Sequence, residues 1–251
     1  MLIMGILNVT PDSFADGGRH NDFNAAVARG LEMIAEGVDI IDIGGESTRP
    51  GADRVSEAEE IERTIPVITE LAKHGARISI DTMRASTAEA AIKAGASIIN
   101  DVSGGLADPE MLQTAARLNV PYIAMHWRGQ SKDMNSKAIY NDVVIDVISE
   151  LQERITAALD AGIEVGNLII DPGLGFAKDA EHNWEIIDSI DSFVDLGYPV
   201  LVGASRKRFL GGDSPDEREQ ATIDLTKRLA TTGVWAVRVH SVKPHKEVLA
   251  Q

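Results

Sequence analysis

One structural unit can be read directly from residues 76–105, ARISIDTMRASTAEAAIKAGASIINDVSGG. Apolar, β-branched runs at 77–81 and 97–102 predict two strands, and the intervening segment 86–93 has helical spacing and stops before Gly95. The two runs are nearly continuously apolar rather than alternating, as expected of parallel strands that are buried on both faces. The stretch therefore predicts a strand, a helix and a second, parallel strand.

The same alternation runs along the whole chain. Apolar runs bounded by turn residues predict eight strands, at 2–9, 39–44, 77–81, 97–102, 122–126, 168–171, 200–204 and 236–240. Helical spacing is found at about 24–36, 56–73, 86–93, 109–118, 141–161, 181–196, 216–231 and 244–250. Several of these segments end at a glycine, as left-handed helix caps do: Gly37, Gly75, Gly95, Gly162, Gly197 and Gly233.

The number of units decides between architectures. Two small domains would fit 251 residues, and an open doubly wound sheet would fit the alternation. Eight units without a linker instead favour a single domain, 1–251, of the α/β class, folded as one (β/α)8 TIM barrel with its site at the C-terminal ends of the strands.

The composition limits the partners of the chain. It has 24 Lys and Arg against 39 Asp and Glu, a formal net charge of −15, which disfavours nucleic acid and anionic membrane surfaces. It has no cysteine, which excludes a disulfide framework and a cysteine nucleophile and fits a cytoplasmic location. We expect neither a signal peptide nor a transmembrane helix, because no apolar stretch approaches ~20 residues.

Polar residues follow nearly every apolar run, at the end where barrel enzymes place their active sites. Each one alone is explained equally well as a helix cap, a turn residue or a structural histidine. Because all strand ends of a barrel open at one mouth, together they predict a site. They are Asn8; Glu46, Thr48 and Arg49; Asp81; Asn100 and Asp101; His126; Asp171; Ser205 and Lys207; and Arg238 and His240.

These groups suit a flat nitrogen heterocycle that carries phosphate. Asp81, Asn100 and Asp171 offer acceptors for a ring rich in N–H donors, such as an aminopyrimidinone. Arg238 and His240 share one face of a strand and, with Lys207, gather positive charge where barrels commonly hold phosphate. Ion pairing with surface acidic residues is the competing explanation, which is weaker because Arg238 and His240 interrupt an apolar strand.

Other reaction classes lack their motifs. The chain has no His-x-His at the end of the first strand, no His-Glu-x-x-His and no Gly-x-Ser-x-Gly, and its glycine pairs do not form a dinucleotide fingerprint. Mg²⁺ stays compatible, since one or two protein oxygens and substrate phosphates can hold it. Glycine-rich stretches at 8–18 and 44–51 are predicted to close over the site, with Phe14 covering an aromatic substrate or packing under its own loop.

Read in order, the motifs resemble those of the dihydropteroate synthase family. They are NVTPDSF (8–14), GGESTRPG (44–51), SIDT (79–82), NDVSGG (100–105), MH (125–126), DPG (171–173), SRK (205–207) and RVH (238–240), and GASRKRFLG (203–211) looks most like actinobacterial members. The resemblance implies a transferase of folate biosynthesis that condenses 6-hydroxymethyl-7,8-dihydropterin diphosphate with 4-aminobenzoate, giving 7,8-dihydropteroate and pyrophosphate. It also implies a Mg²⁺ cofactor, a homodimer and a target of sulfonamides.

By this resemblance each site residue receives a role. Pterin would be held by Asp81, Asn100, Asp171 and Lys207, with Met125 beside it, and the diphosphate by Thr48, Arg238 and His240, with Val239 also counted as substrate-binding. Asn8 would help to hold Mg²⁺, and Phe14, Asp16, Arg49 and Pro50 would form the aminobenzoate pocket. The implied catalytic set is Lys207, Arg238, His240, Asp16 and Arg49. The implied mechanism is dissociative: pyrophosphate leaves first, and the amine then captures a pterin cation.

Departures from the family pattern keep alternatives open. Arg208 stands where many members have Ser, residues 210–218 are compact and polar, and Ser241 replaces the usual Asp, which bears on the aminobenzoate contact and on dimerisation. A corrinoid-dependent methyltetrahydrofolate methyltransferase would share the barrel but would not need Arg238, His240 or the 205–207 motif. A non-catalytic pterin-binding paralogue usually loses loop residues, and both loops are intact here.

Overall fold

The computed structural model describes residues 1–10, 19–46, 54–130 and 134–250. Within these ranges one parallel sheet contains eight strands in the order β6-β5-β4-β3-β2-β1-β8-β7. An isolated parallel bridge between Ile170 and Val200 joins its two edges, so the sheet closes into the predicted TIM barrel. The strands are β1 (Leu2–Asn8), β2 (Ile40–Gly44), β3 (Ile78–Asp81), β4 (Ile98–Asp101), β5 (Tyr122–Met125), β6 (Leu168–Asp171), β7 (Leu201–Val202) and β8 (Ala236–Val239).

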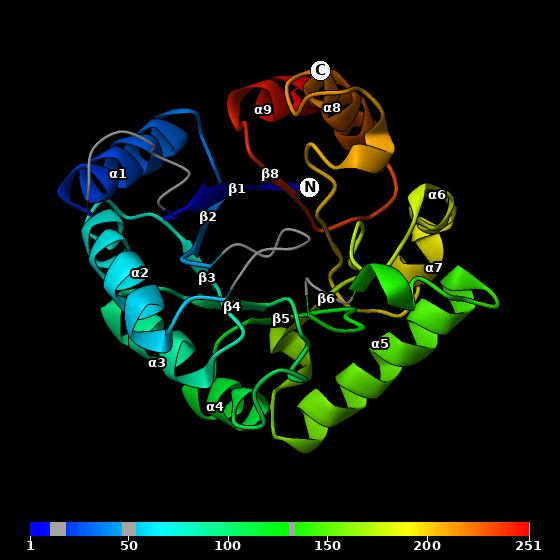
Figure 1. Ribbon diagram of the computed structural model, residues 1–251, viewed down its shortest axis with the longest axis horizontal. Helices are drawn as coiled ribbons and strands as arrows, with labels where there is room; N and C mark the ends of the chain where they lie inside the picture. The colour runs from blue at the N-terminus through cyan, green and yellow to red at the C-terminus, as the bar shows by residue number, and fades with distance from the viewer. Residues whose placement is uncertain (11–18, 47–53, 131–133, 251) are drawn as a thin grey trace.

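Helices surround the barrel as an outer ring (Figure 1). The segment predicted as one helix over 181–196 is two helices, because the backbone leaves the helical region at Ser189 (φ −107°, ψ 21°). The six glycines predicted to end helices all have positive φ. The α-helices are α1 (Arg19–Ala35), α2 (Glu57–Ala72), α3 (Ala85–Ala94), α4 (Met111–Leu118), α5 (Val143–Asp160), α6 (Ala180–Asp188), α7 (Ile190–Val194), α8 (Glu217–Leu229) and α9 (Lys243–Leu249), with 3-10 turns η2 (Met134–Lys137), η3 (Val165–Asn167) and η4 (Arg208–Leu210).

Strand side chains alternate between the barrel interior and the surrounding helices. Residues such as Ile41, Ile99 and Val237 point outward and form a large core with the helices. The alternate positions fill the interior with a separate apolar layer, here called the floor: Met4, Ile40, Ile98, Ile123, Ile169, Leu201 and Ala236. Because residues two apart in a strand lie on the same face, the floor determines which later residues of each strand also point inward.

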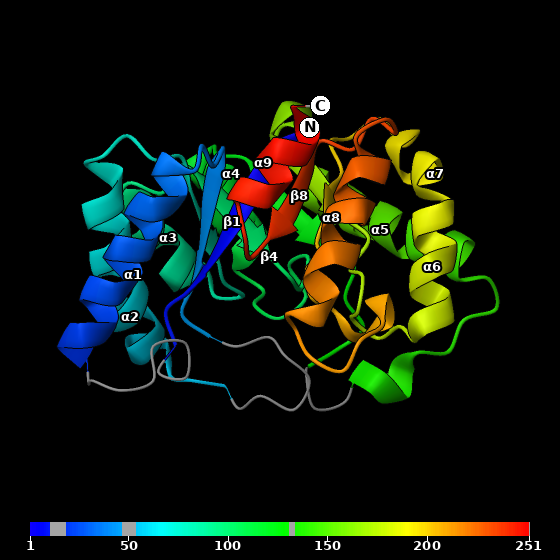
Figure 2. The same cartoon turned by 90° about the horizontal axis from the view of Figure 1, so that it is seen from above.

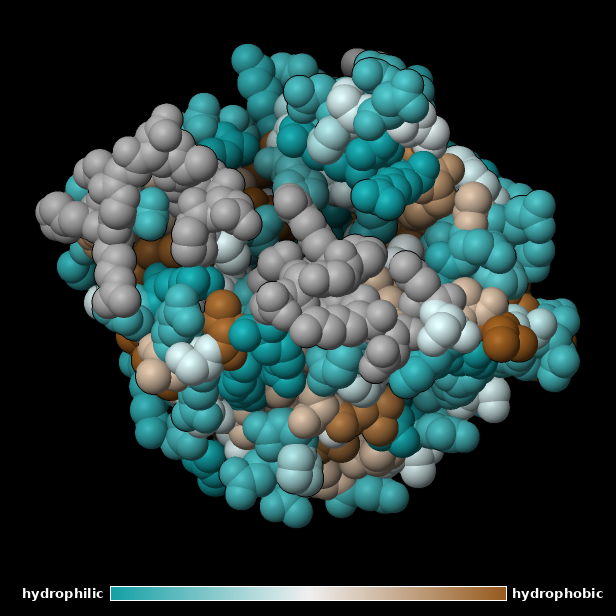
Figure 3. Space-filling view, in the orientation of Figure 1, coloured by the Kyte–Doolittle hydropathy of each residue, from teal (hydrophilic) through white to brown (hydrophobic). Residues whose placement is uncertain are grey.

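The chain termini and the polar residues that follow the strands lie at opposite ends of the barrel. Both chain termini lie at the end where the strands begin (Figure 2), so the polar residues that follow the strands lie at the opposite end. Most of the coloured residues on the face shown in Figure 3 are hydrophilic, and a group of hydrophobic residues is exposed in the lower part of the view. None of the helices in the described ranges is long and apolar enough to cross a membrane.

Candidate active site

The polar residues of the candidate site lie directly above the floor of the barrel. On five strands the residue that stands two positions after a floor residue forms this layer, because its side chain points into the same interior. Asp81 is level with Asn100 in the sheet register and joins this layer from β3. The layer contains Asp42 (β2), Asn100 (β4), Met125 (β5), Asp171 (β6) and Arg238 (β8).

Arg238 lies between two carboxylates. Its Nε donates to Oδ2 of Asp42 at 2.6 Å, and its Nη2 donates to Oδ2 of Asp81 at 2.7 Å. Asp42 is fully buried, and its Oδ2 also accepts from Nδ2 of Asn100 at 3.0 Å. Four strands, β2, β3, β4 and β8, are therefore joined by one charged hydrogen-bond network, which fixes the plane of the guanidinium.

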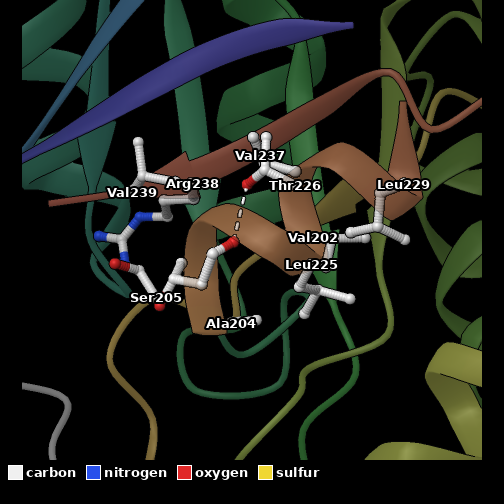
Figure 4. A pocket seen from close by; sticks show the side chains of 10 residues that line it. Val202, Ala204, Ser205, Leu225, Thr226, Leu229, Val237, Arg238 and Val239 are labelled. Atoms are coloured by element: carbon white, nitrogen blue, oxygen red, sulfur yellow. Dashed lines mark hydrogen bonds between the residues drawn. The ribbon is translucent and has the colours of Figure 1, made fainter. Parts of the chain in front are cut away.

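The guanidinium of Arg238 turns away from the apolar side chains of Val202, Leu225 and Leu229 (Figure 4). These side chains line a small cavity between β7, β8 and α8 with a volume of about 10 Å³. Such a volume has room for about one water molecule and not for an organic substrate. The chemistry of the site is therefore carried by the charged layer inside the barrel.

Asp171 and Lys207 form the opposite side of the site. Oδ1 of Asp171 accepts from the backbone N–H of Gly173 at 2.7 Å. The ammonium group of Lys207 donates to the carbonyl of Leu174 and lies 4.7 Å from the centre of the Phe176 ring. Both polar side chains are thus held by the turn at 173–176, directly after β6.

Burial shifts the protonation of this layer. It raises the pKa of Asp81 to about 7, against the opposing charge of Arg238, and it raises the pKa of Asp171, against the Gly173 hydrogen bond and Lys207. Burial lowers the pKa of Lys207 to about 8, although Asp171 raises it. Such shifts show that isolated charges are costly here, so the layer is suited to a ligand that brings hydrogen-bond donors and a counter-charge.

His240 is oriented by Ser205. The Ser205 hydroxyl accepts from the backbone N–H of His240 at 3.2 Å and lies 2.9 Å from its Nδ1. This contact orients the ring whether the hydroxyl donates to Nδ1 or accepts from it. Ser205 therefore holds the imidazole of His240 beside Arg238, at the end of β8.

The structure brings together most of the predicted site residues that it describes. Asp81, Asn100, Met125, Asp171 and Arg238 share the interior, and Lys207 is tied to the turn beside Asp171. The side chain of Val239 is buried outside the barrel, in the core shared with the helices, and its place among the substrate-binding residues stays a prediction. The predicted residues Phe14, Asp16, Thr48, Arg49 and Pro50 lie outside the described residues.

Three other residues that follow the strands have structural partners instead. Glu46 accepts from Arg84 at 2.7 Å and from Arg54 at 2.9 Å. Asp101 points outward, where its carboxylate accepts from two backbone N–H groups and two hydroxyls in and beside its own turn. His126 is buried in contact with Lys178 and Glu150.

Two charged residues of the site region were missed by sequence reasoning. Asp42 sits inside the run Ile40-Ile41-Asp42-Ile43, and a carboxylate interrupting an apolar strand is the signal that would have found it. Lys178 precedes a helix in a polar segment and carries no such signal. Its role depends on contacts with residues far away in the sequence.

The departures from the family pattern are accommodated in the loop after β7. The guanidinium of Arg206 donates to the hydroxyl of Ser241 at 2.8 Å and to Glu219 at 2.6 Å. Arg218 donates back to the carbonyl of Arg206 at 2.8 Å, which anchors the compact stretch before α8. Arg208 is exposed. The hydroxyl of Ser241 therefore helps to hold Arg206, which directly precedes Lys207.

A metal ion at this end of the barrel would need ligands from a bound substrate in addition to those from the described residues. Among the described residues, no group of three or more His, Cys, Asp or Glu could hold a metal ion. Asn8 ends β1 on the inward face, since it is four residues after the floor residue Met4. One amide oxygen is compatible with Mg²⁺, which is commonly held by few protein oxygens together with phosphates and water.

Comparison with known proteins agrees with this geometry. The family described as pterin binding enzyme matches residues 4–240. The dihydropteroate synthase of Mycobacterium leprae is 48% identical, over 98% of this chain and 90% of its own, and that of Bacillus subtilis is also 48% identical, over 96% and 84%. The structure of Xanthomonas albilineans dihydropteroate synthase with 4-aminobenzoic acid is similar, with a TM-score of 0.93, 43% identity, and coverage of 99% and 90%.

Proposed function

This chain belongs to the dihydropteroate synthase family of pterin-binding enzymes, and from that membership we propose which of its described residues carry each step of the reaction. The activity is that of a transferase in folate synthesis. It joins 6-hydroxymethyl-7,8-dihydropterin diphosphate to 4-aminobenzoate and releases pyrophosphate.

The observation that carries the assignment of roles is the charged layer above the floor. Its inward-facing carboxylates, Asp42, Asp81 and Asp171, outnumber the cations Arg238 and Lys207. In addition, Oδ1 of Asp42 is buried without a hydrogen-bond partner among the described residues. A layer rich in acceptors and short of donors favours a ring edge with several N–H groups, which the aminopyrimidinone part of a pterin provides.

We assign pterin recognition to Asp81, Asn100, Asp171 and Lys207, with Met125 packed against the ring. The buried carboxylates accept from the ring N–H groups, and this restores the hydrogen bonds that burial otherwise makes costly. Asp42 has an indirect role, because it holds both Arg238 and Asn100 by hydrogen bonds.

We assign the diphosphate to Arg238 and His240. The guanidinium carries a fixed positive charge; burial opposes it, but Asp42 and Asp81 outweigh burial and raise the pKa of Arg238. We assign to His240 the tautomer in which Nδ1 accepts from the Ser205 hydroxyl and Nε2–H donates to the diphosphate. Donors that are already in place when negative charge develops stabilise the transition state without reorganisation.

The reaction needs no protein nucleophile. The bond between the methylene carbon and the diphosphate oxygen breaks, and the electron pair leaves with pyrophosphate. The nitrogen of 4-aminobenzoate then forms the new bond to that carbon and releases a proton. Carboxylates beside the ring favour the intermediate cation, while Arg238 and His240 favour the departing anion, so the site stabilises both charges that develop as the bond breaks.

We also propose that Asn8 contributes an oxygen to a Mg²⁺ ion on the diphosphate. When bound, Mg²⁺ would neutralise charge on the leaving group. Its predicted protein ligand is one amide, so removing Mg²⁺ with EDTA should lower turnover without unfolding the chain, as followed by circular dichroism. A homodimer and a cytoplasmic location stay predictions. So does a special likeness to actinobacterial members, because the Bacillus subtilis relative is as similar as the mycobacterial one.

The test is pyrophosphate release on mixing the protein with the pterin diphosphate, 4-aminobenzoate and Mg²⁺, with and without a sulfonamide. Lys207→Ala should reduce turnover at least about tenfold and keep the fold, since it removes a ligand and not a core residue. Lys93→Ala is the matched control, because its side chain is 69% exposed on α3. Pterin binding without turnover would indicate the non-catalytic paralogue, and methyl transfer from methyltetrahydrofolate would indicate the other pterin-binding class.

A further inference from the structure

A buried charged cluster lies behind the pterin site and touches no assigned substrate group. Its centre is Lys178, which precedes α6 and is 8% exposed. His126, after β5, lies next to it with 1% exposure, and Glu150 on α5 lies beyond His126. A lysine is almost never buried unless it is paired, so this position calls for an explanation.

The ammonium group of Lys178 has three acceptors for its three protons. Nζ lies 2.8 Å from Nδ1 of His126, and it donates to the carbonyls of Gly173 and Phe176 at 3.1 Å each. A neutral amine has only two N–H groups and would leave one of these acceptors unpaired. The charged form of Lys178 therefore satisfies all three acceptors.

His126 connects this ammonium group to a carboxylate. Because its Nδ1 accepts from Lys178, the ring proton lies on Nε2, which donates to Glu150 at 2.9 Å. Arg128 binds the same carboxylate and stacks on Tyr140 at 3.8 Å. Lys178 is thus linked through one imidazole to an ion pair at the rim of the barrel.

Two of the acceptors of Lys178 belong to the turn at 173–176, which supports the pterin site. The N–H of Gly173 donates to Asp171, and the carbonyl of Leu174 accepts from Lys207. The ring of Phe176 packs under the same ammonium group of Lys207. Any movement of this turn would therefore move two assigned pterin ligands together.

The backbone of this turn is under conformational constraint. Ala177 has φ +48°, a region that a residue with a Cβ adopts at a cost of about 1 kcal/mol or more. Gly173 has φ +69°, and a Cβ on it would lie 2.4 Å from the carbonyl oxygen of His126. Such a backbone persists only when its surroundings hold it, and the ammonium group of Lys178 supplies two of the holding contacts.

We propose that Lys178 is a positioning residue of the pterin site, whose ammonium group holds the turn at 173–176 and thereby places Asp171 and Lys207. The identity of the ligand in this statement rests on the proposed function. The role of Lys178 in holding the turn does not.

The charges around Lys178 agree with this role. Burial lowers its pKa to about 7, with Lys207 and Arg128 adding to the effect and Asp171 and Glu150 opposing it. Burial lowers the pKa of His126 to about 4, so the ring is neutral and accepts from Lys178. Burial raises the pKa of Glu150, but the hydrogen bonds from His126 and Arg128 outweigh it and lower the value to about 2. Below a pH of about 7 the amine of Lys178 is therefore charged and donates to all three acceptors.

The test uses the full chain with Lys178→Met, which preserves length and removes charge and donors. We expect the Kd for 6-hydroxymethylpterin, measured by calorimetry, to rise at least about tenfold, or ~1.4 kcal/mol. The KM for the pterin diphosphate should rise with it, whereas Lys93→Met should behave as wild type. A crystal structure of the variant should show the turn displaced and the Leu174 carbonyl away from Lys207.

A second variant tests whether the loss of pterin affinity follows the number of N–H donors at position 178. Lys178→Gln keeps two N–H donors, so its Kd should lie between wild type and Lys178→Met; it also replaces the methionine variant if that chain does not fold. A variant with lowered thermal stability but unchanged pterin Kd and an unmoved turn would overturn the proposal. Failure of the wild-type chain to bind pterin would contradict the proposed function, and the position of the turn in the variant would still decide the role of Lys178.

Discussion

Replacing Arg238 by Met tests the electrostatic account of the site. The guanidinium lies 2.6 Å from Asp42 and 2.7 Å from Asp81, both buried in the barrel. Removing one partner of a buried ion pair typically costs about 3–5 kcal/mol, because the remaining charge is left unpaired. Here two carboxylates lose their cation at once. We therefore expect a folded variant whose free energy of unfolding near neutral pH is lower by about that amount.

The loss should depend on pH with a definite sign. Burial raises the pKa of Asp81 from 3.8 to about 7, and Arg238 acts against this rise, so the pKa should be higher still in the variant. Between its ordinary and raised pKa, Asp81 holds a proton that the unfolded chain releases. Stability accordingly falls as pH rises through that window. At pH values above the wild-type pKa, each unit by which the variant raises the pKa of Asp81 increases the difference in unfolding free energy between wild type and variant by about 1.4 kcal/mol.

Lys207 also increases the difference in unfolding free energy between wild type and the Arg238→Met variant as pH rises. Burial lowers its pKa to about 8, and Arg238 contributes to the lowering. A lysine whose pKa is lowered by folding gives a protein that gains stability as pH rises above the folded pKa. Without Arg238 that gain begins at higher pH. The free energy of unfolding of the variant therefore falls further below that of wild type in alkaline solution.

The measurement is urea unfolding followed by circular dichroism, at about pH 6 and about pH 8.5. Arg228→Met is the control, since it removes a 48% exposed arginine paired with Asp188 on the surface and should cost about 0–1 kcal/mol at either pH. The stability gap for Arg238→Met should be larger at the higher pH by at least about 1 kcal/mol. An equal gap at both pH values would refute the charge coupling between Arg238 and Asp81.

Three further substitutions address single contacts. Gly173→Ala should lower the free energy of unfolding by about 2 kcal/mol or more, because φ is +69° and the new Cβ would lie 2.4 Å from the His126 carbonyl oxygen; Gly166→Ala, with no atom within 4 Å, should be nearly neutral, and equal urea midpoints would contradict the clash. Asp42→Asn should raise the Kd for 6-hydroxymethylpterin about tenfold in calorimetry, since it weakens the hydrogen bond by which Asp42 holds the assigned pterin ligand Asn100; an unchanged Kd would remove Asp42 from the site. Ser205→Ala should lower kcat about tenfold with little change in Tm, because His240 loses the hydroxyl that orients its ring, and unaltered steady-state kinetics would show that this contact is not needed for the reaction.

The sequence alone determined the barrel and most of its site. Each predicted strand is present within a few residues, because runs of Ile, Val and Leu bounded by breakers leave little choice of local structure. The predicted strand-end residues Asp81, Asn100, Asp171 and Arg238 meet because every parallel strand of a closed barrel ends at the same mouth. One long helix was predicted where α6 and α7 occur, since helical spacing continues across Ser189 and does not show the break.

Only the tertiary structure decided which of two neighbouring polar residues faces the site. Asn100 points into the barrel and Asp101 points out, and the sequence cannot distinguish them because a strand buried on both faces has no polar alternation to mark its inner side. The closed sheet likewise pairs Arg238 with Asp42 across 196 residues and moves Val239 to the outer core. Lys178 acquires its partners in the same way. Such contacts depend on how distant strands and turns meet in space, a relation that local propensity and spacing do not contain.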